Sequence, residues 1–236
     1  MNYLYVAPFF AYLIGTSVAA KFEGVSYSVA YGVLMVGITG LFLCLAATAR
    51  PKAKTAGDDR HSSVGLSEIA PHWRVAEGFL VGVIGIALWI WLSDLQLERR
   101  FLPEMLQPAE RVSFNPLSEF DSSWGKWAFV AVRLFGLAIV VPVAEELFWR
   151  GFLLRWIIDP NWEQVPLGSF TWRSCLAVTA LFTLAHPEWL AAAVYCLLIN
   201  GLLYWRRDLW QCVVAHGVSN LLLGLYVLKY EVWYLW

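Results

Sequence analysis

The chain is organised around residues Val140–Leu154, which read VVPVAEELFWRGFLL. Two adjacent carboxylates and an arginine stand here in an otherwise apolar run. An ionised side chain at the centre of a bilayer costs about 2.5–3.5 kcal/mol on insertion scales, and such residues are functional-site hypotheses by default. We therefore take Glu145, Glu146 and Arg150 as the first candidate site residues.

Helical spacing predicts different environments for the two carboxylates. Glu146 and Arg150 are four residues apart with the acid first, the favourable order for an ion pair. Glu145 lies about 100° around the helix from Glu146. We expect Arg150 to neutralise Glu146 and to leave Glu145 available for acid–base chemistry. The alternative is a purely structural Glu–Arg clamp at a kink near Pro142.

Composition predicts a polytopic membrane protein. The chain has 236 residues, of which 59% are hydrophobic and 15% charged, with 14 Trp. Soluble domains average about 45–50% apolar and about 25% charged residues. The formal net charge of −1 does not favour nucleic-acid binding. We expect the four cysteines, all in apolar runs, to pack as small hydrophobes.

The predicted fold is an all-α transmembrane bundle of seven to eight helices, because apolar segments long enough to span a bilayer alternate with polar ones. We expect a single integral membrane domain over 1–236, with N-terminal spans and connectors in 1–127 and a motif-bearing core in 128–228. Arg50–Arg74 is predicted to be a flexible loop that leaves His61 and His72 solvated. The predicted helices cover 3–20, 28–49, 75–93, 128–142, a Glu-Glu helix to about Ile158, 171–186, 189–205 and 209–228.

Two later apolar segments carry further polar groups. Phe182 and His186 share one helix face at a spacing of four, and so do His216 and Asn220. Polar side chains are costly against lipid, so we expect these segments to converge with the Glu-Glu helix inside the bundle. The alternative is that each group only links helices through hydrogen bonds.

Together these side chains suit hydrolysis. Glu145 could take a proton from water as general base, with His186 orienting that water. His216 and Asn220 could donate hydrogen bonds to an oxyanion. The alternative is a divalent metal on Glu145, His186 and His216, since two histidines and a glutamate form a known zinc set. The HExxH pattern of zincins is absent from the sequence.

The ordered motifs EExxxR at 145–150, FxxxH at 182–186 and HxxxN at 216–220 resemble those of the CAAX-protease and bacteriocin-processing (CPBP, or Abi) family of intramembrane endopeptidases, over about 128–228. The resemblance implies that Glu145 activates water, that Glu146, Arg150 and Phe182 support it, and that His186, His216 and Asn220 complete the site. The resemblance favours a mechanism that uses no metal cofactor.

The resemblance also implies a setting and partners. The compact, Trp-rich chain resembles bacterial CAAX-protease-related proteins, which implies the inner (plasma) membrane. The expected partners are the bilayer, a membrane-associated protein or peptide substrate, and a sortase-type protein. Two other functions stay open. The chain could be a non-catalytic binding or bacteriocin-immunity protein, or a proton-coupled transporter, although it lacks the repeated halves of many transporters.

Overall fold

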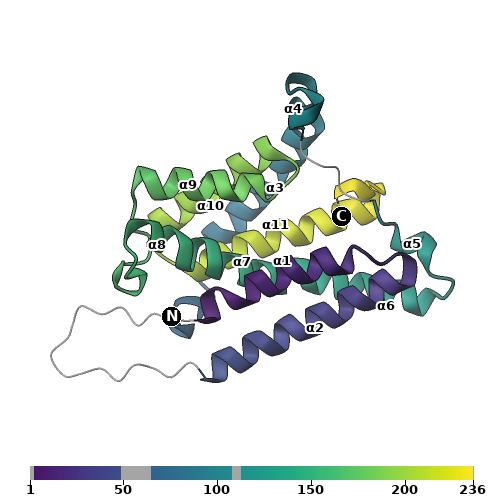
Figure 1. Ribbon diagram of the computed structural model, residues 1–236, viewed down its shortest axis with the longest axis horizontal. Coiled ribbons are helices and arrows are strands. Elements are labelled where there is room, and N and C mark those ends of the chain that lie inside the picture. The colour runs from purple at the N-terminus through teal and green to yellow at the C-terminus, as the bar shows by residue number, and fades with distance from the viewer. Residues whose placement is uncertain (1–2, 49–64, 108–112, 236) are drawn as a thin grey trace.

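The computed structural model describes residues 3–48, 65–107 and 113–235, and these residues form helices and no strands. The predicted all-α fold is therefore confirmed (Figure 1). His61 and most of the predicted 50–74 loop lie outside the described residues. The elements are η1 Tyr3–Tyr5, α1 Ala7–Ala19, α2 Gly24–Thr48, η2 Leu66–Ile69, α3 Ala76–Leu95, α4 Leu97–Phe101, η3 Glu104–Leu106, α5 Pro116–Glu119, α6 Ser123–Phe135, η4 Gly136–Val140, α7 Val141–Glu146, η5 Leu147–Leu153, α8 Leu154–Ile158, η6 Trp162–Gln164, α9 Trp172–Leu184, α10 Trp189–Arg206, α11 Leu209–Tyr230 and η7 Trp233–Leu235.

The helices are those of an integral membrane protein. In the described residues, five are long and apolar enough to cross a bilayer, and Tyr3–Ala19 and Trp172–Leu184 are shorter apolar helices. The outer helix α2 shows large apolar side chains to its surroundings, with Val29, Val33 and Val36 60%, 68% and 74% exposed. Such a surface is stable against lipid and not against water.

Helix α11 lies in the middle of the bundle, between α3 and α10 on one side and α7 on the other (Figure 1). Its contact with α3 is close because α3 carries glycines. A Cβ atom on Gly82 would lie 2.6 Å from the Ala215 carbonyl oxygen. The Ser219 hydroxyl donates to the Gly82 carbonyl over 2.8 Å. The glycines of α3 therefore allow α11 to lie at the centre of the bundle.

The sequence prediction divided one long helix in two. A span at 128–142 and a separate Glu-Glu helix were expected, but Ser123–Ile158 is a single helical run. It contains two π-helical segments, η4 and η5, on either side of α7. Pro142 stands at the start of α7 and has no N–H to donate to the preceding turn. The helix accommodates the proline by adopting π-helical turns in place of some α-helical ones, and it continues to Ile158.

Helices α9 and α11 begin at side-chain caps. Thr171 accepts a hydrogen bond from the Ser174 amide at the start of α9, and Asp208 accepts from the Trp210 and Gln211 amides at the start of α11. Asp208 also lies 2.8 Å from His72 Nε2, so His72, which is exposed as predicted, has a carboxylate partner as well. These caps fix where the segments that carry FxxxH and HxxxN enter the bundle.

Candidate active site

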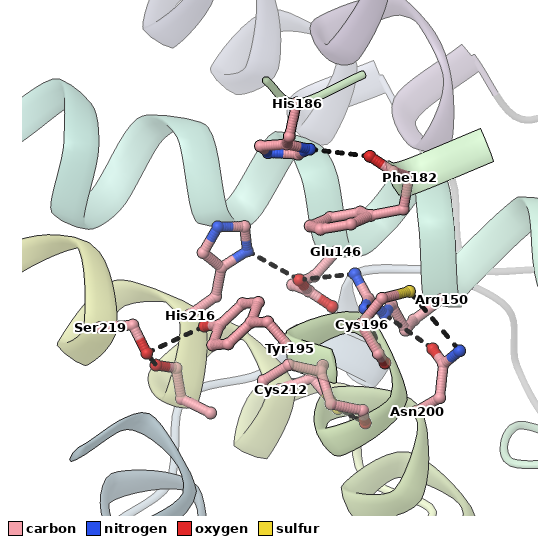
Figure 2. Close-up of polar contacts among 12 residues, drawn as sticks. Glu146, Arg150, Phe182, His186, Tyr195, Cys196, Asn200, Cys212, His216 and Ser219 are labelled. Carbon is pink, nitrogen blue, oxygen red and sulfur yellow. Dashed lines mark hydrogen bonds and ion pairs between the residues drawn. The ribbon is translucent and has the colours of Figure 1, made fainter. Parts of the chain in front are cut away.

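Glu146 is the centre of a buried polar cluster (Figure 2). Its Oε1 accepts a hydrogen bond from Arg150 Nη1 over 3.1 Å and lies 2.8 Å from His216 Nδ1. The side chains of Glu146 and Arg150 are both 0% exposed. The predicted i,i+4 ion pair is therefore present, and a second helix, α11, shares its carboxylate.

This contact indicates which ring nitrogen of His216 carries a proton. A carboxylate that is paired with arginine can only accept, so His216 Nδ1 is the donor. In the neutral ring, Nε2 is then an acceptor, and it becomes a donor only when the ring is protonated. Glu146 holds the imidazole in place and would stabilise an imidazolium, as second-shell carboxylates do.

Arg150 ties three helices together. Its Nε donates to Asn200 Oδ1 over 3.1 Å, and its Nη2 donates to the Cys196 carbonyl over 3.4 Å, both on α10. The guanidinium carbon lies 5.1 Å from the centre of the Phe182 ring on α9. The N–H groups at the edge of the guanidinium therefore have acceptors, and a ring lies over one of its faces. Breaking a buried ion pair of this kind typically costs about 3–5 kcal/mol.

Glu145 differs from its neighbour. It is 7% exposed, and its Oε2 is buried without a hydrogen-bond partner at standard geometry within the described part of the chain. Its carboxylate interacts electrostatically with His216, Glu146 and Arg150, so it belongs to the same cluster. The two adjacent carboxylates thus have separate environments, in the manner that assigns separate acid–base roles. The catalytic role of Glu145 stays a prediction.

His186 lies above this cluster, in the turn after α9 (Figure 2). Its Nδ1 is 2.8 Å from the Phe182 carbonyl oxygen, and its ring stacks on Phe182 with centroids 4.4 Å apart. The centroid of the Trp89 ring lies 5.6 Å from that of the His186 ring and 5.7 Å from that of the Tyr195 ring. The Tyr195 and His216 ring centroids are 5.8 Å apart. The two histidines therefore converge on one region, linked by aromatic rings.

Asn220 is placed on α11 one turn after His216. Its Nδ2 donates to the Leu137 carbonyl over 3.0 Å, in the π-helical segment η4. Close to this bond, a Cβ atom on Gly217 would lie 2.6 Å from the Ala138 carbonyl oxygen. One amide hydrogen of Asn220 thus holds the turn before α7, and only the other is left for the predicted oxyanion.

The metal alternative rests on Glu145, His186 and His216. Across residues 3–48, 65–107 and 113–235, no three His, Cys, Asp or Glu side chains stand together in an arrangement that could hold a metal ion. His216 Nδ1 is also occupied by Glu146. Metal independence of the reaction therefore stays a prediction.

Residues 126–222 match the family described as type II CAAX prenyl endopeptidase Rce1-like. This part of the chain is similar to the CAAX protease family. The CAAX protease match begins in α6 and ends in α11, so it includes all three motifs. No curated protein and no solved structure matches the chain.

Several residues of the cluster were missed from the sequence. Asn200 and Cys196 bond Arg150, and Tyr195 and Trp89 lie between the histidines. Asn200 had a usable signal, because a lone amide inside an apolar span needs a buried partner. Cysteines and aromatics are common in such spans, so the other three carried no comparable signal.

Proposed function

We propose that this chain is an intramembrane endopeptidase that hydrolyses a peptide bond of a membrane-associated protein or peptide, with Glu145 as the general base. The family that residues 126–222 match is one of endopeptidases. The observation that carries the proposal is the asymmetry of the pair: Arg150 and His216 both bond Glu146 Oε1, while Glu145 Oε2 has no hydrogen-bond partner at standard geometry among the described residues.

The proposed reaction uses water as the nucleophile. Glu145 accepts a proton from water while the water oxygen bonds to the scissile carbonyl carbon, and the carbonyl electrons move to oxygen. Protonated His216 and the second amide hydrogen of Asn220 stabilise that oxyanion; one such donor is typically worth about 2.7–4 kcal/mol. The C–N bond then breaks as Glu145 returns its proton to the leaving nitrogen. Glu146 and Arg150 hold His216, and His186 orients the water.

An apolar cavity supports a substrate with a membrane-embedded part. It has a volume of about 100 Å³ and adjoins α7, with Pro8, Ile38, Phe42, Ile139 and Val143 in its wall. Such a wall suits a hydrocarbon chain or an apolar side chain. We propose the plasma membrane of a bacterium as the location, and a sortase-type protein as a partner that supplies processed substrates.

The test is cleavage by purified protein in lipid nanodiscs. Two quenched-fluorescent peptides would be compared, one ending in a farnesylated CAAX sequence and the other identical but without the prenyl group. We expect Glu145→Gln to lower kcat at least about 100-fold. Glu104→Gln, on an exposed connector residue, is the matched control and should keep full activity. Undiminished cleavage by Glu145→Gln would refute the proposed base.

A further inference from the structure

Trp149 has an unusual buried group next to the proposed base. Its side chain is 5% exposed, and its indole Nε1 has no hydrogen-bond partner at standard geometry among the described residues. Buried tryptophan N–H groups normally find a partner. Leaving one unsatisfied costs about 1–3 kcal/mol, so the group calls for an explanation.

The position of Trp149 supplies one. It follows Glu145 by four residues, so both side chains share one face of the helix. The Trp149 side chain lies within reach of a weak hydrogen bond to the Glu145 carboxylate. At standard geometry, however, neither the indole N–H nor Glu145 Oε2 has a partner in the described chain, so a donor and an acceptor lie close together without a well-formed bond.

The Trp149 ring also faces the helix that carries His186. Its centroid is 5.7 Å from that of Phe182, which stacks on His186. The Trp149 ring also packs against the rings of Phe9 and Phe148, with centroids 5.2 Å and 4.9 Å from its own. Phenylalanine serves for packing at these neighbouring positions, and packing alone needs no N–H group. The Trp149 ring thus lies near both the proposed base and the phenylalanine ring that stacks on the second histidine.

We propose that the Trp149 indole N–H and Glu145 Oε2 together hold the attacking water, which makes Trp149 a further catalytic residue. This inference rests on the proposed function. The water accepts the indole hydrogen bond on one lone pair and donates one hydrogen to Glu145. Its second lone pair then attacks the carbonyl carbon, the O–C bond forms, and the donated proton passes to Glu145.

The neighbouring carboxylate is less suited to this task. Glu146 Oε2 is also buried and unpaired within the described residues. However, Glu146 Oε1 already accepts from Arg150 and lies 2.8 Å from His216 Nδ1, so this carboxylate is engaged in holding the cluster together. The water site is therefore assigned to Glu145 and Trp149.

The first test is Trp149→Phe, which removes the N–H and keeps an aromatic ring. We expect kcat on the cleaved peptide to fall about 10- to 100-fold because the water loses its position, with little change in KM. Trp156→Phe, on the 47% exposed Trp156 of the same helical run, is the matched control and should retain full activity. Unfolding temperatures of both variants should match that of the parent.

The second test needs no turnover. In protein labelled with ¹⁵N at tryptophan indoles, the Trp149 resonance is the one lost in Trp149→Phe. We expect it to show cross-relaxation with bound water, and to lose it in Glu145→Leu. Absence of that cross-relaxation in the parent protein would overturn the inference.

The two proposals fail in different ways. If Glu145→Gln abolishes cleavage while Trp149→Phe is fully active, only the role of Trp149 is wrong. If both variants cleave normally, the assignment of Glu145 as the general base is wrong as well.

Discussion

Replacing Arg150 with methionine would test whether the buried polar cluster is built as described. Methionine keeps a long unbranched side chain but removes the donors to Glu146, Asn200 and the Cys196 carbonyl. Glu146 would then remain buried, with His216 as its one described partner. Removing one member of a buried ion pair typically costs about 3–5 kcal/mol. Total stabilities are about 5–15 kcal/mol, so the loss would be a large fraction.

The assay is unfolding of the purified protein in mixed micelles, followed by circular dichroism as sodium dodecyl sulfate is added. A second variant, Arg150→Met with Glu146→Gln, removes both charges and leaves an amide oxygen to accept from His216. It should recover about half or more of the lost free energy, because a charge is no longer stranded.

An exposed ion pair supplies the control. Arg206 and Glu77 are 3.5 Å apart, and their side chains are 37% and 31% exposed. Arg206→Met should cost no more than about 1 kcal/mol, as surface pairs do. The reasoning fails if Arg150→Met is as mild as this control, or if adding Glu146→Gln restores nothing.

Three further predictions follow from the same geometry. Gly217→Ala should destabilise the protein by about 1–3 kcal/mol because its Cβ would meet the Ala138 carbonyl oxygen at 2.6 Å, whereas a Cβ on Gly201 has nothing within 4 Å and Gly201→Ala should be tolerated; equal unfolding curves would contradict this. Asn220→Ala should lower both kcat and stability, the latter by about 1–3 kcal/mol, because the Leu137 carbonyl loses its donor; loss of activity at unchanged stability would mean that the Leu137 bond contributes nothing. Dialysis against a chelator should leave cleavage unchanged, and inactivation reversed by added Zn²⁺ would show that a metal takes part.

The sequence predicted what depends on local spacing. The Glu146–Arg150 pair follows from a four-residue interval, and the helices at 75–93, 189–205 and 209–228 correspond closely to α3, α10 and α11. Convergence of the polar segments followed from the cost of exposing them to lipid. None of these inferences needed to know how the helices pack.

Contacts between distant segments were beyond such reasoning. His216 bonds Glu146, seventy residues away, because α11 approaches closely at Gly82 and Gly217. That register depends on which small residues meet, and several glycines were available in the sequence. The two π-helical segments were missed because Pro142 was expected to separate two helices, whereas the helix changes its turn there and continues.

The π-helical segment Gly136–Val140 has a consequence for how this helix tolerates change. A π turn holds more residues than an α turn, and such turns are frequent at functional sites. Because the wider turn takes up an extra residue in place, deleting one residue there would restore ordinary α geometry and leave the helix downstream near its present orientation. The same deletion in an α-helical turn would rotate everything downstream by about 100° and point both carboxylates away from the histidines, although no motif residue had been altered. The π-helical segment is thus the place where this helix can lose a residue and keep its site.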